Sequence, residues 1–365
     1  MKTLAELQAE CAALGITVET NGRPSKDPYT AALREYHWRK DHPDKPLPEQ
    51  FKPMLLSDWD DLTLDQAQEL EQDCHAWIVE PKENGVRSLL HVEGGGVRIT
   101  SRCVSETTYR LSELQHNLSH LMKGLDRLKG TILDGELVCP VATVDAGSSV
   151  TANPLQTTMA ILATSPENAQ RVQEGQNCRL RFHIFDILRR TGTELVALPL
   201  IERQAHLVQA FRAIDNPCLE QVPSFVVGKA DVHRHIIEAG GEGTVWKKAD
   251  QPYEPGRRVK HWIKRKRVVE AEAFVTGFKP GRNGHTRLVG ALEFSVQGSD
   301  GVTIPVAWVS NWTDQERQAM IHIDPTGKIV LNPAYLGRRA LIFGQDHSAK
   351  SRRIRHARIR RWLDR

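Results

Sequence analysis

The stretch EPKENGVRS, residues 80–88, contains a single lysine, Lys82, among ordinary polar neighbours. Most lysines are solvated surface charges, so this stretch by itself does not separate a surface side chain from a nucleophile. A nucleophilic lysine must be neutral, whereas an unperturbed lysine has a pKa of about 10.4. Burial, neighbouring cations or a bound metal favour the neutral amine. The role of Lys82 therefore depends on what the rest of the chain brings to it.

Five stretches downstream of Lys82 carry polar residues in patterns that suit nucleotide chemistry. Asp134 and Glu136 are two residues apart, so on a strand they share one face; an exposed edge strand is the alternative interpretation. Lys264 and Lys266 share a face in the same way, and their charges suit a phosphate group. In chain order the five are TSRCVSETTYRLSEL (100–114), TILDGELV (131–138), FHIFDIL (182–188), EGTVWKK (242–248) and HWIKRKR (261–267).

This series resembles the covalent nucleotidyltransferases, which comprise DNA ligases, RNA ligases and mRNA capping enzymes. Their signature is a KxDG nucleophile motif followed by DGE, FD, EGxVxK and WxKxK motifs, in the order found here over roughly residues 75–267. The run PYEPGRRVKHWIKRK (252–266) is particularly similar to ATP-dependent DNA ligases. The resemblance implies an α+β fold: an ATP-grasp-like nucleotidyltransferase domain with antiparallel sheets, followed by an OB-fold barrel.

The resemblance also implies roles for the matching residues. Lys82 is the expected nucleophile, and Lys264 and Lys266 are expected to contact the α-phosphate of ATP. Mg²⁺ usually takes one or two carboxylates together with phosphate oxygens, so Glu136 and Glu242 are its candidate ligands. The residues expected to bind the nucleotide are Glu80, Arg87, Arg102, Glu136, Phe185, Lys247 and Arg361.

Two of these assignments have alternatives in the sequence. Phe185 alternates with apolar neighbours, so a core aromatic is the alternative to stacking on the purine ring. Lys247 and Lys248 are adjacent, and we expect one to reach phosphate while the other is solvated.

The chain is expected to have three parts. Residues 1–48 form a small helical unit, similar to SAP-like DNA-binding modules, and a proline-rich linker; packing or dimerisation is the alternative role for the helices. Residues 49–267 form the nucleotidyltransferase domain. Residues 268–365 are rich in short strands separated by Gly, Asn and Asp turns, which favours a five-stranded OB barrel.

Composition limits the function classes. The 365 residues carry a net charge of +4, with 26% charged and 40% hydrophobic residues, as in globular proteins. Basic residues cluster at 260–267 and 346–365, which suggests a polyanionic partner, with a solvated helical face as the alternative. Six scattered cysteines without a CxxC pair indicate reduced thiols in the cytoplasm. The sequence contains no run of eighteen apolar residues, so it predicts no membrane-spanning helix. We expect a monomer.

The sequence departs from the family pattern in two places. The nucleophile motif reads KENG, with Asn84 where the family usually has aspartate, and RNA ligases vary more at this position. The last family motif, RxDK, is only approximated by RIRHARIRRWLDR (353–365), in which Arg361 is the best match although one position out of register.

These features favour an ATP-dependent ligase that uses Mg²⁺ and seals nicks in duplex DNA, with a role in DNA repair or replication. An RNA or RNA/DNA hybrid ligase is the nearest alternative. NAD-dependent ligases are disfavoured because their zinc-binding cysteines are absent, and a capping enzyme fits the PYEPGRR run less well. From another class, a non-catalytic nucleic-acid-binding relative remains, but the complete set of motif lysines and glutamates argues against it.

Asn84 generates a testable prediction. It keeps the size of the usual aspartate without its negative charge, and a missing anion near Lys82 favours the neutral amine. We expect self-adenylylation by the natural sequence to persist to lower pH than in Asn84→Asp. The measurement is the pH–rate profile of label transfer from ATP, and identical profiles would contradict the prediction.

Overall fold

The computed structural model describes residues 2–18, 26–43, 51–72, 75–105, 110–140, 154–175, 178–281, 288–345 and 353–363. Most of the predicted linker, residues 19–25 between the two N-terminal helices, and residues 346–352 and 364–365 of the basic tail lie outside the described residues. By their contacts the residues separate into two compact units. One is built mostly from residues before Arg265, and the other from Arg265 onward together with His233–Thr244.

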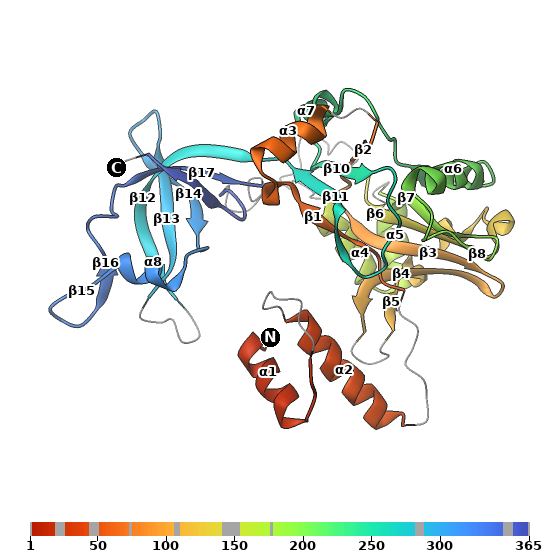
Figure 1. The fold of residues 1–365 in the computed structure, drawn as a ribbon, viewed down its shortest axis with the longest axis horizontal. Coiled ribbons are helices and arrows are strands. Elements are labelled where there is room, and N and C mark those ends of the chain that lie inside the picture. Colours follow the sequence, from red (N-terminus) through yellow and green to blue (C-terminus); the bar gives the residue numbers. More distant parts are fainter. Residues whose placement is uncertain are drawn as a thin grey trace. The chain divides into compact units, whose positions relative to one another are not determined.

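The helices and strands follow one another along the chain in the order of their labels, most of which are shown in Figure 1. The α-helices are α1 (Leu4–Ala13), α2 (Asp27–Asp41), α3 (Leu64–Gln72), α4 (Pro154–Leu162), α5 (Pro166–Gly175), α6 (Leu200–Phe211), α7 (Lys229–Glu238) and α8 (Asp314–Ala319). Short 3-10 helices are η1 (Trp59–Asp61), η2 (Gln115–Asn117), η3 (Ser119–Met122) and η4 (Asp126–Leu128).

The strands up to the end of the predicted nucleotidyltransferase region are β1 (Leu55–Asp58), β2 (Trp77–Pro81), β3 (Val86–Glu93), β4 (Gly96–Val104), β5 (Leu111–Glu113), β6 (Thr131–Val138), β7 (Arg181–Arg190), β8 (Thr193–Glu194), β9 (Leu219–Gln221), β10 (Gly243–Lys248) and β11 (Arg258–Lys266). They are followed by β12 (Val269–Pro280), β13 (Val289–Gln297), β14 (Thr303–Val309), β15 (Ile321–Ile323), β16 (Ile329–Leu331), β17 (Arg339–Gly344) and β18 (Arg358–Trp362).

The N-terminal helices form where the sequence predicts them. Thr3 and Glu6 make a reciprocal capping box at the start of α1, which satisfies two N–H groups that a helix leaves without partners. After the helix, Gly15 has a φ of +67°, a conformation that glycine adopts at little cost. Leu7 and Cys11 of α1 pack against Leu33 of α2 in a small core of their own. The relation of this pair to SAP modules stays a prediction.

Two sheets form the centre of the first unit (Figure 1). The smaller has the strand order β1-β11-β10-β2, and the larger runs β5-β4-β3-β6-β7-β8, with β9 beside β7. Residues from both sheets, among them Ile78, Leu89, Phe185 and Trp262, share one buried cluster, so their inner faces pack together. Glu80 and Asp134, which lie on those inner faces, are buried.

The outer faces of both sheets are covered by helices. Leu70 of α3 packs with Val79, Trp246 and Ile263 on the outer face of the smaller sheet. On the larger sheet, α4, α5 and the short 3-10 helices supply apolar side chains to the main cluster. The strand TILDGELV, which became β6, is buried on both faces for this reason, and Glu136 is its most accessible residue.

The second unit contains a five-stranded antiparallel sheet in the order β14-β13-β12-β17-β18. A bridge between Ala307 on β14 and Ile354, just before β18, brings the two ends of the sheet together. Val275, Leu292, Phe294 and other apolar residues fill its interior. These features confirm the α+β prediction and the OB-like C-terminal sheet. Among the helices that the structure describes, none is long and apolar enough to cross a membrane.

A fully buried ion pair fixes α6 to the larger sheet. The guanidinium of Arg203 donates to both carboxylate oxygens of Asp186, at 2.9 and 2.8 Å, and neither side chain is exposed. Arg203 also donates to the carbonyl oxygen of Leu198 at 2.7 Å. Breaking a buried pair from one side leaves a charge without compensation, which costs far more than the pair itself contributes.

We therefore expect Arg203→Met to lower the free energy of unfolding by about 3 kcal/mol or more. The matched control is Arg212→Met, an exposed arginine one residue after α6, for which the change should stay within about 0.5 kcal/mol. Urea unfolding followed by circular dichroism measures both, and equal losses in the two variants would contradict the prediction.

Candidate active site

Lys82 directly follows β2, the strand whose last three residues before Pro81 are buried. Its side chain is half-buried, and its Nζ donates to the carbonyl oxygen of Glu83 at 3.3 Å. The lysine therefore stands on a short loop between β2, at the edge of the smaller sheet, and β3, an interior strand of the larger one. Such an anchored position suits a nucleophile better than a mobile surface tip does.

Gly85, the last residue of the KENG motif, packs directly against β6. A Cβ at this position would stand 2.0 Å from the carbonyl oxygen of Leu137 and 3.0 Å from the Cγ of Glu136. No side chain fits at such distances, so glycine allows the Lys82 loop to lie on the strand that carries the DGE motif. The first two sequence motifs thus meet through backbone contact.

Arg87 and Asp134 form a bidentate ion pair on neighbouring strands of the larger sheet. Two guanidinium nitrogens of Arg87 donate to the two carboxylate oxygens of Asp134, each at 2.6 Å. The hydroxyl of Tyr253 donates to the same carboxylate at 2.7 Å. Burial alone would lower the pKa of Arg87, but the charge of Asp134 raises it above its ordinary value. Burial and the same carboxylate raise the pKa of Tyr253 well above its ordinary value.

Two cations contact the ring of Phe185. The guanidinium carbon of Arg87 is 4.4 Å from its ring centroid, and the Nζ of Lys247 is 4.6 Å away. Trp262 meets the ring edge-on with centroids 6.2 Å apart, and Phe185 is 9% exposed. Among the described contacts Phe185 packs as a core aromatic, and its stacking on a purine stays a prediction.

Glu80 and Lys247 form a third buried ion pair, with 2.6 Å between Nζ and Oε2. The hydroxyl of Ser224 donates to the other oxygen of Glu80 at 2.9 Å. Burial raises the pKa of Glu80, although Lys247 and Ser224 oppose this shift. Both residues are 2% exposed in this pair, so their predicted contacts with a nucleotide remain predictions.

His183 faces the residue after the nucleophile. Its Nδ1 is 3.1 Å from Oε1 of Glu83, and its Nε2 is 3.9 Å from Glu220. Burial alone would lower the pKa of His183, but the hydrogen bond and charge of Glu83 raise it above its ordinary value, with a further contribution from Glu220. This contact ties the Lys82 loop to β7 in addition to the contact made by Gly85.

The two predicted phosphate-binding lysines lie two residues apart on β11, which confirms that they are on one strand. The Nζ of Lys264 is 3.1 Å from Oδ2 of Asp58. Lys266 is half-buried and belongs by its contacts to the second unit, as does Glu242. There the N–H of Arg267 donates to the carbonyl oxygen of Glu242 at 2.8 Å.

Other predicted residues are more exposed. Arg102 is exposed near the end of β4, and Arg361 is exposed on β18 of the second unit. Glu136 is half-buried on β6 directly across from Arg87. Within the described ranges no group of three or more His, Cys, Asp or Glu side chains could hold a metal ion.

Comparison with known proteins decides the family. A family model described as the ATP dependent DNA ligase domain matches residues 53–266, more than half of the chain. The chain belongs to the ATP-dependent DNA ligase family. The match runs from just before β1 to the end of β11, so it includes both sheets, the Lys82 loop, the Arg87–Asp134 pair and Lys264.

The relatives of this ligase-family chain are longer proteins. A DNA ligase of Methanothrix thermoacetophila is 31% identical over 247 residues, covering 67% of this chain and 42% of the relative. The bifunctional non-homologous end joining protein LigD of Bacillus subtilis is 26% identical over 278 residues, covering 71% of this chain and 42% of that protein. The matched region is thus less than half of either relative.

A solved structure from a study of Lig E DNA ligases has the same fold. It aligns with a TM-score of 0.55 and 17% identity, covering 85% of this chain and 98% of that one. At this identity the likeness concerns the fold alone. It confirms the predicted arrangement of a nucleotidyltransferase domain followed by OB-like strands.

Three residues of this ligase-family site were missed by sequence reasoning. Tyr253 and Trp262 lie within the PYEPGRRVKHWIKRK run, but their partners come from β6 and β7 and leave no local pattern. Asp58 lies outside every motif, and only the pairing of β1 with β11 shows its relation to Lys264. Asp134 was placed on the correct strand face without its partner Arg87.

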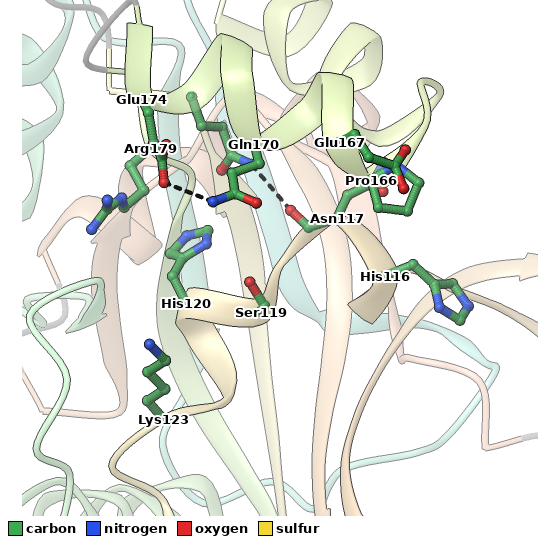
Figure 2. Close-up of a pocket in the computed structure, with 11 residues that line it drawn as sticks. His116, Asn117, Ser119, His120, Lys123, Pro166, Glu167, Gln170, Glu174 and Arg179 are labelled. Atoms are coloured by element: carbon green, nitrogen blue, oxygen red, sulfur yellow. Dashed lines mark hydrogen bonds between the residues drawn. The ribbon is translucent and has the colours of Figure 1, made fainter.

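A separate hollow of about 280 Å³ lies away from these residues, between η3 and α5. Figure 2 shows Gln170 and Glu174 of α5, joined by a hydrogen bond of 3.1 Å, together with Arg179, His120 and Lys123 around it. None of the predicted site residues lines this hollow. Its position on the helical side of the larger sheet separates it from the inner faces described above.

Gly85 generates a prediction with a matched control. Gly85→Ala would force the Lys82 loop away from β6, so we expect lysyl adenylylation to slow at least tenfold, since misplacing a reacting group by about 1 Å can cost a hundredfold. Gly94→Ala, in the open hairpin turn where no atom lies within 4 Å of a Cβ, should retain the rate. Label transfer from ATP measures both, and a fully active Gly85→Ala would contradict the packing argument.

Proposed function

We propose that this chain is an ATP-dependent ligase that seals nicks between a 3′-hydroxyl and a 5′-phosphate in duplex DNA. The observation that carries the proposal is the anchored Lys82 loop, which Gly85 holds against the DGE strand within the region matched by the ligase family model. The relatives named DNA ligase support DNA as the substrate class. RNA-containing nicks are the alternative, which rests on Asn84 in place of the family's usual aspartate.

In the proposed first step, Lys82 attacks ATP as a neutral amine. A bond forms between its Nζ and the α-phosphorus, the bond from that phosphorus to the bridging oxygen breaks, and pyrophosphate leaves. The amine loses its proton to solvent. The ammonium groups of Lys264 and Lys266 would stabilise the negative charge that develops on the α-phosphate. The product is AMP joined to Lys82 through a phosphorus–nitrogen bond.

In the next two steps the AMP group is transferred and then released. An oxygen of the 5′-phosphate at the nick displaces Lys82 and takes up the AMP, and the amine regains a proton. The 3′-hydroxyl then attacks that 5′-phosphorus, loses its proton and displaces AMP, which leaves a continuous strand. We assign nucleotide contacts to Glu80, Arg87, Arg102, Glu136, Phe185 and Lys247, and a contact from the basic C-terminal strand to Arg361.

The predicted carboxylates fit a Mg²⁺ ion that takes most of its ligands from phosphate and water. The described residues hold no ready-made cluster of three or more ligands, but Mg²⁺ commonly uses one or two carboxylates and completes its shell with phosphate oxygens and water. Glu136 and Glu242, both half-buried, are the carboxylates we propose. When bound, Mg²⁺ supplies positive charge against the phosphates of ATP.

The proposal also includes a role in DNA repair, a cytoplasmic location and a monomeric state. A relative is named for non-homologous end joining, which supports repair over replication. The cysteines that the structure describes are free thiols, which fits the reducing conditions of the cytoplasm.

The test is transfer of label from α-labelled ATP in the presence of Mg²⁺. We expect an acid-labile label on the natural sequence and none on Lys82→Ala, because the phosphorus–nitrogen bond forms only at that amine. The absence of label, or label that persists in Lys82→Ala, would contradict the covalent mechanism. A panel of nicks with DNA or RNA on each side then measures the substrate class, and equal or better sealing of RNA would overturn the DNA assignment.

The N-terminal helices yield a second test. If residues 1–45 act as a SAP-like module, deleting them should weaken nick binding while self-adenylylation is retained. Binding is measured by fluorescence anisotropy of a labelled nicked duplex. An unchanged affinity in the truncated chain would favour a packing role for the helices.

A further inference from the structure

Asp58 is the last residue of β1, and its carboxylate faces one of the proposed phosphate-binding lysines. Its Oδ2 is 3.1 Å from the Nζ of Lys264, and the two residues are direct partners in the parallel pairing of β1 with β11. No motif of the sequence includes Asp58, which lies outside the stretches that carry the proposed chemistry.

An irregularity in the strand pairing creates this contact. Leu56 of β1 pairs with Val259, whereas the next residue, Ser57, pairs with Ile263. Three residues of β11 therefore have no counterpart on β1, and the hydroxyl of Ser57 donates to the carbonyl oxygen of Val259 at 2.7 Å where the register shifts. With regular pairing Asp58 would lie opposite His261 instead. Bulges of this kind commonly re-aim a side chain near an active site.

The Asp58 carboxylate does not cap the helix that follows it. It precedes the 3-10 helix η1, where an aspartate typically accepts a hydrogen bond from a backbone N–H of the first turn. The structure shows no such bond from its side chain, although its backbone is extended as in a cap. The side chain of Asp58 is 37% exposed and that of Lys264 24%, so an ion pair between them adds little to stability.

We propose that Asp58 is a positioning residue that holds the Lys264 ammonium where the α-phosphate of ATP binds, an inference that rests on the proposed function. A lysine side chain has four flexible carbons, and ordering it costs conformational entropy. An ammonium has three N–H donors, so one can be held by Asp58 while two remain for phosphate oxygens. The ion pair orders Lys264 before ATP arrives, which lowers the entropic cost of stabilising the reacting phosphate.

The experiment is a double-mutant cycle on the full chain. The rate of lysyl–AMP formation at saturating ATP is measured for the natural sequence, Asp58→Asn, Lys264→Met and the double variant. We expect Asp58→Asn to slow the reaction about tenfold or more, with little change in the ATP concentration for half-maximal rate. In the Lys264→Met background Asp58→Asn should have no further effect, and Asp58→Glu should restore part of the rate. Asp61→Asn, exposed in η1, is the matched control and should behave as the natural sequence.

Two results would overturn the inference: a rate in Asp58→Asn equal to that of the natural sequence, or an equal loss from Asp58→Asn with and without Lys264. The second result would mean that Asp58 supports the fold, and thermal unfolding of each variant provides the independent measure of folding. If the natural sequence forms no lysyl–AMP, the proposed function fails together with the inference. If lysyl–AMP forms and only Asp58→Asn is without effect, the inference alone fails.

Discussion

The ion pair between Arg87 and Asp134 is the contact on which the first unit depends. Taking two charges out of water costs several kcal/mol each, so the pair is tolerable only with good geometry and further hydrogen bonds. The structure supplies both: a bidentate arrangement and the Tyr253 hydroxyl as an additional donor. The same hydroxyl accepts the N–H of Met54 at 2.9 Å, so the segment before β1 is also tied to this centre.

Three glycines turn separated sequence motifs into neighbours. Gly85 packs against Leu137 of β6, and a Cβ at Gly135 would stand 2.5 Å from the carbonyl oxygen of His183 on β7. In the second unit, Gly243 has a φ of +147°, and a Cβ there would be 2.1 Å from the carbonyl oxygen of Arg265. In each case the glycine belongs to one motif and its neighbour lies in or beside another. The motifs therefore act together because their backbones touch, and side-chain chemistry is added to that frame.

The fold was largely predictable because strand patterns are local. The apolar and β-branched runs GTVWKK (243–248) and RALIFG (339–344) form β10 and β17 over their whole length, and the glycine-rich run EGGG (93–96) forms the hairpin turn between β3 and β4. The site was predictable only through motif order. The burial of Glu80 with Lys247 and the contact of Asp58 with Lys264 depend on pairing between distant strands. Periodicity along one strand carries no information about such partners, and a three-residue shift in register leaves no trace in composition.

The register shift between β1 and β11 also divides β11 into two parts with different roles. Side chains alternate between faces with a period of two, so an odd number of extra residues reverses the alternation relative to β1. The part of β11 before the shift packs into the core through Val259, whereas the part after it carries Lys264 and Lys266. Gain or loss of one residue inside the shift would turn Lys264 to the opposite face of the sheet. The tolerance of this strand to insertions is therefore set by parity and not by length.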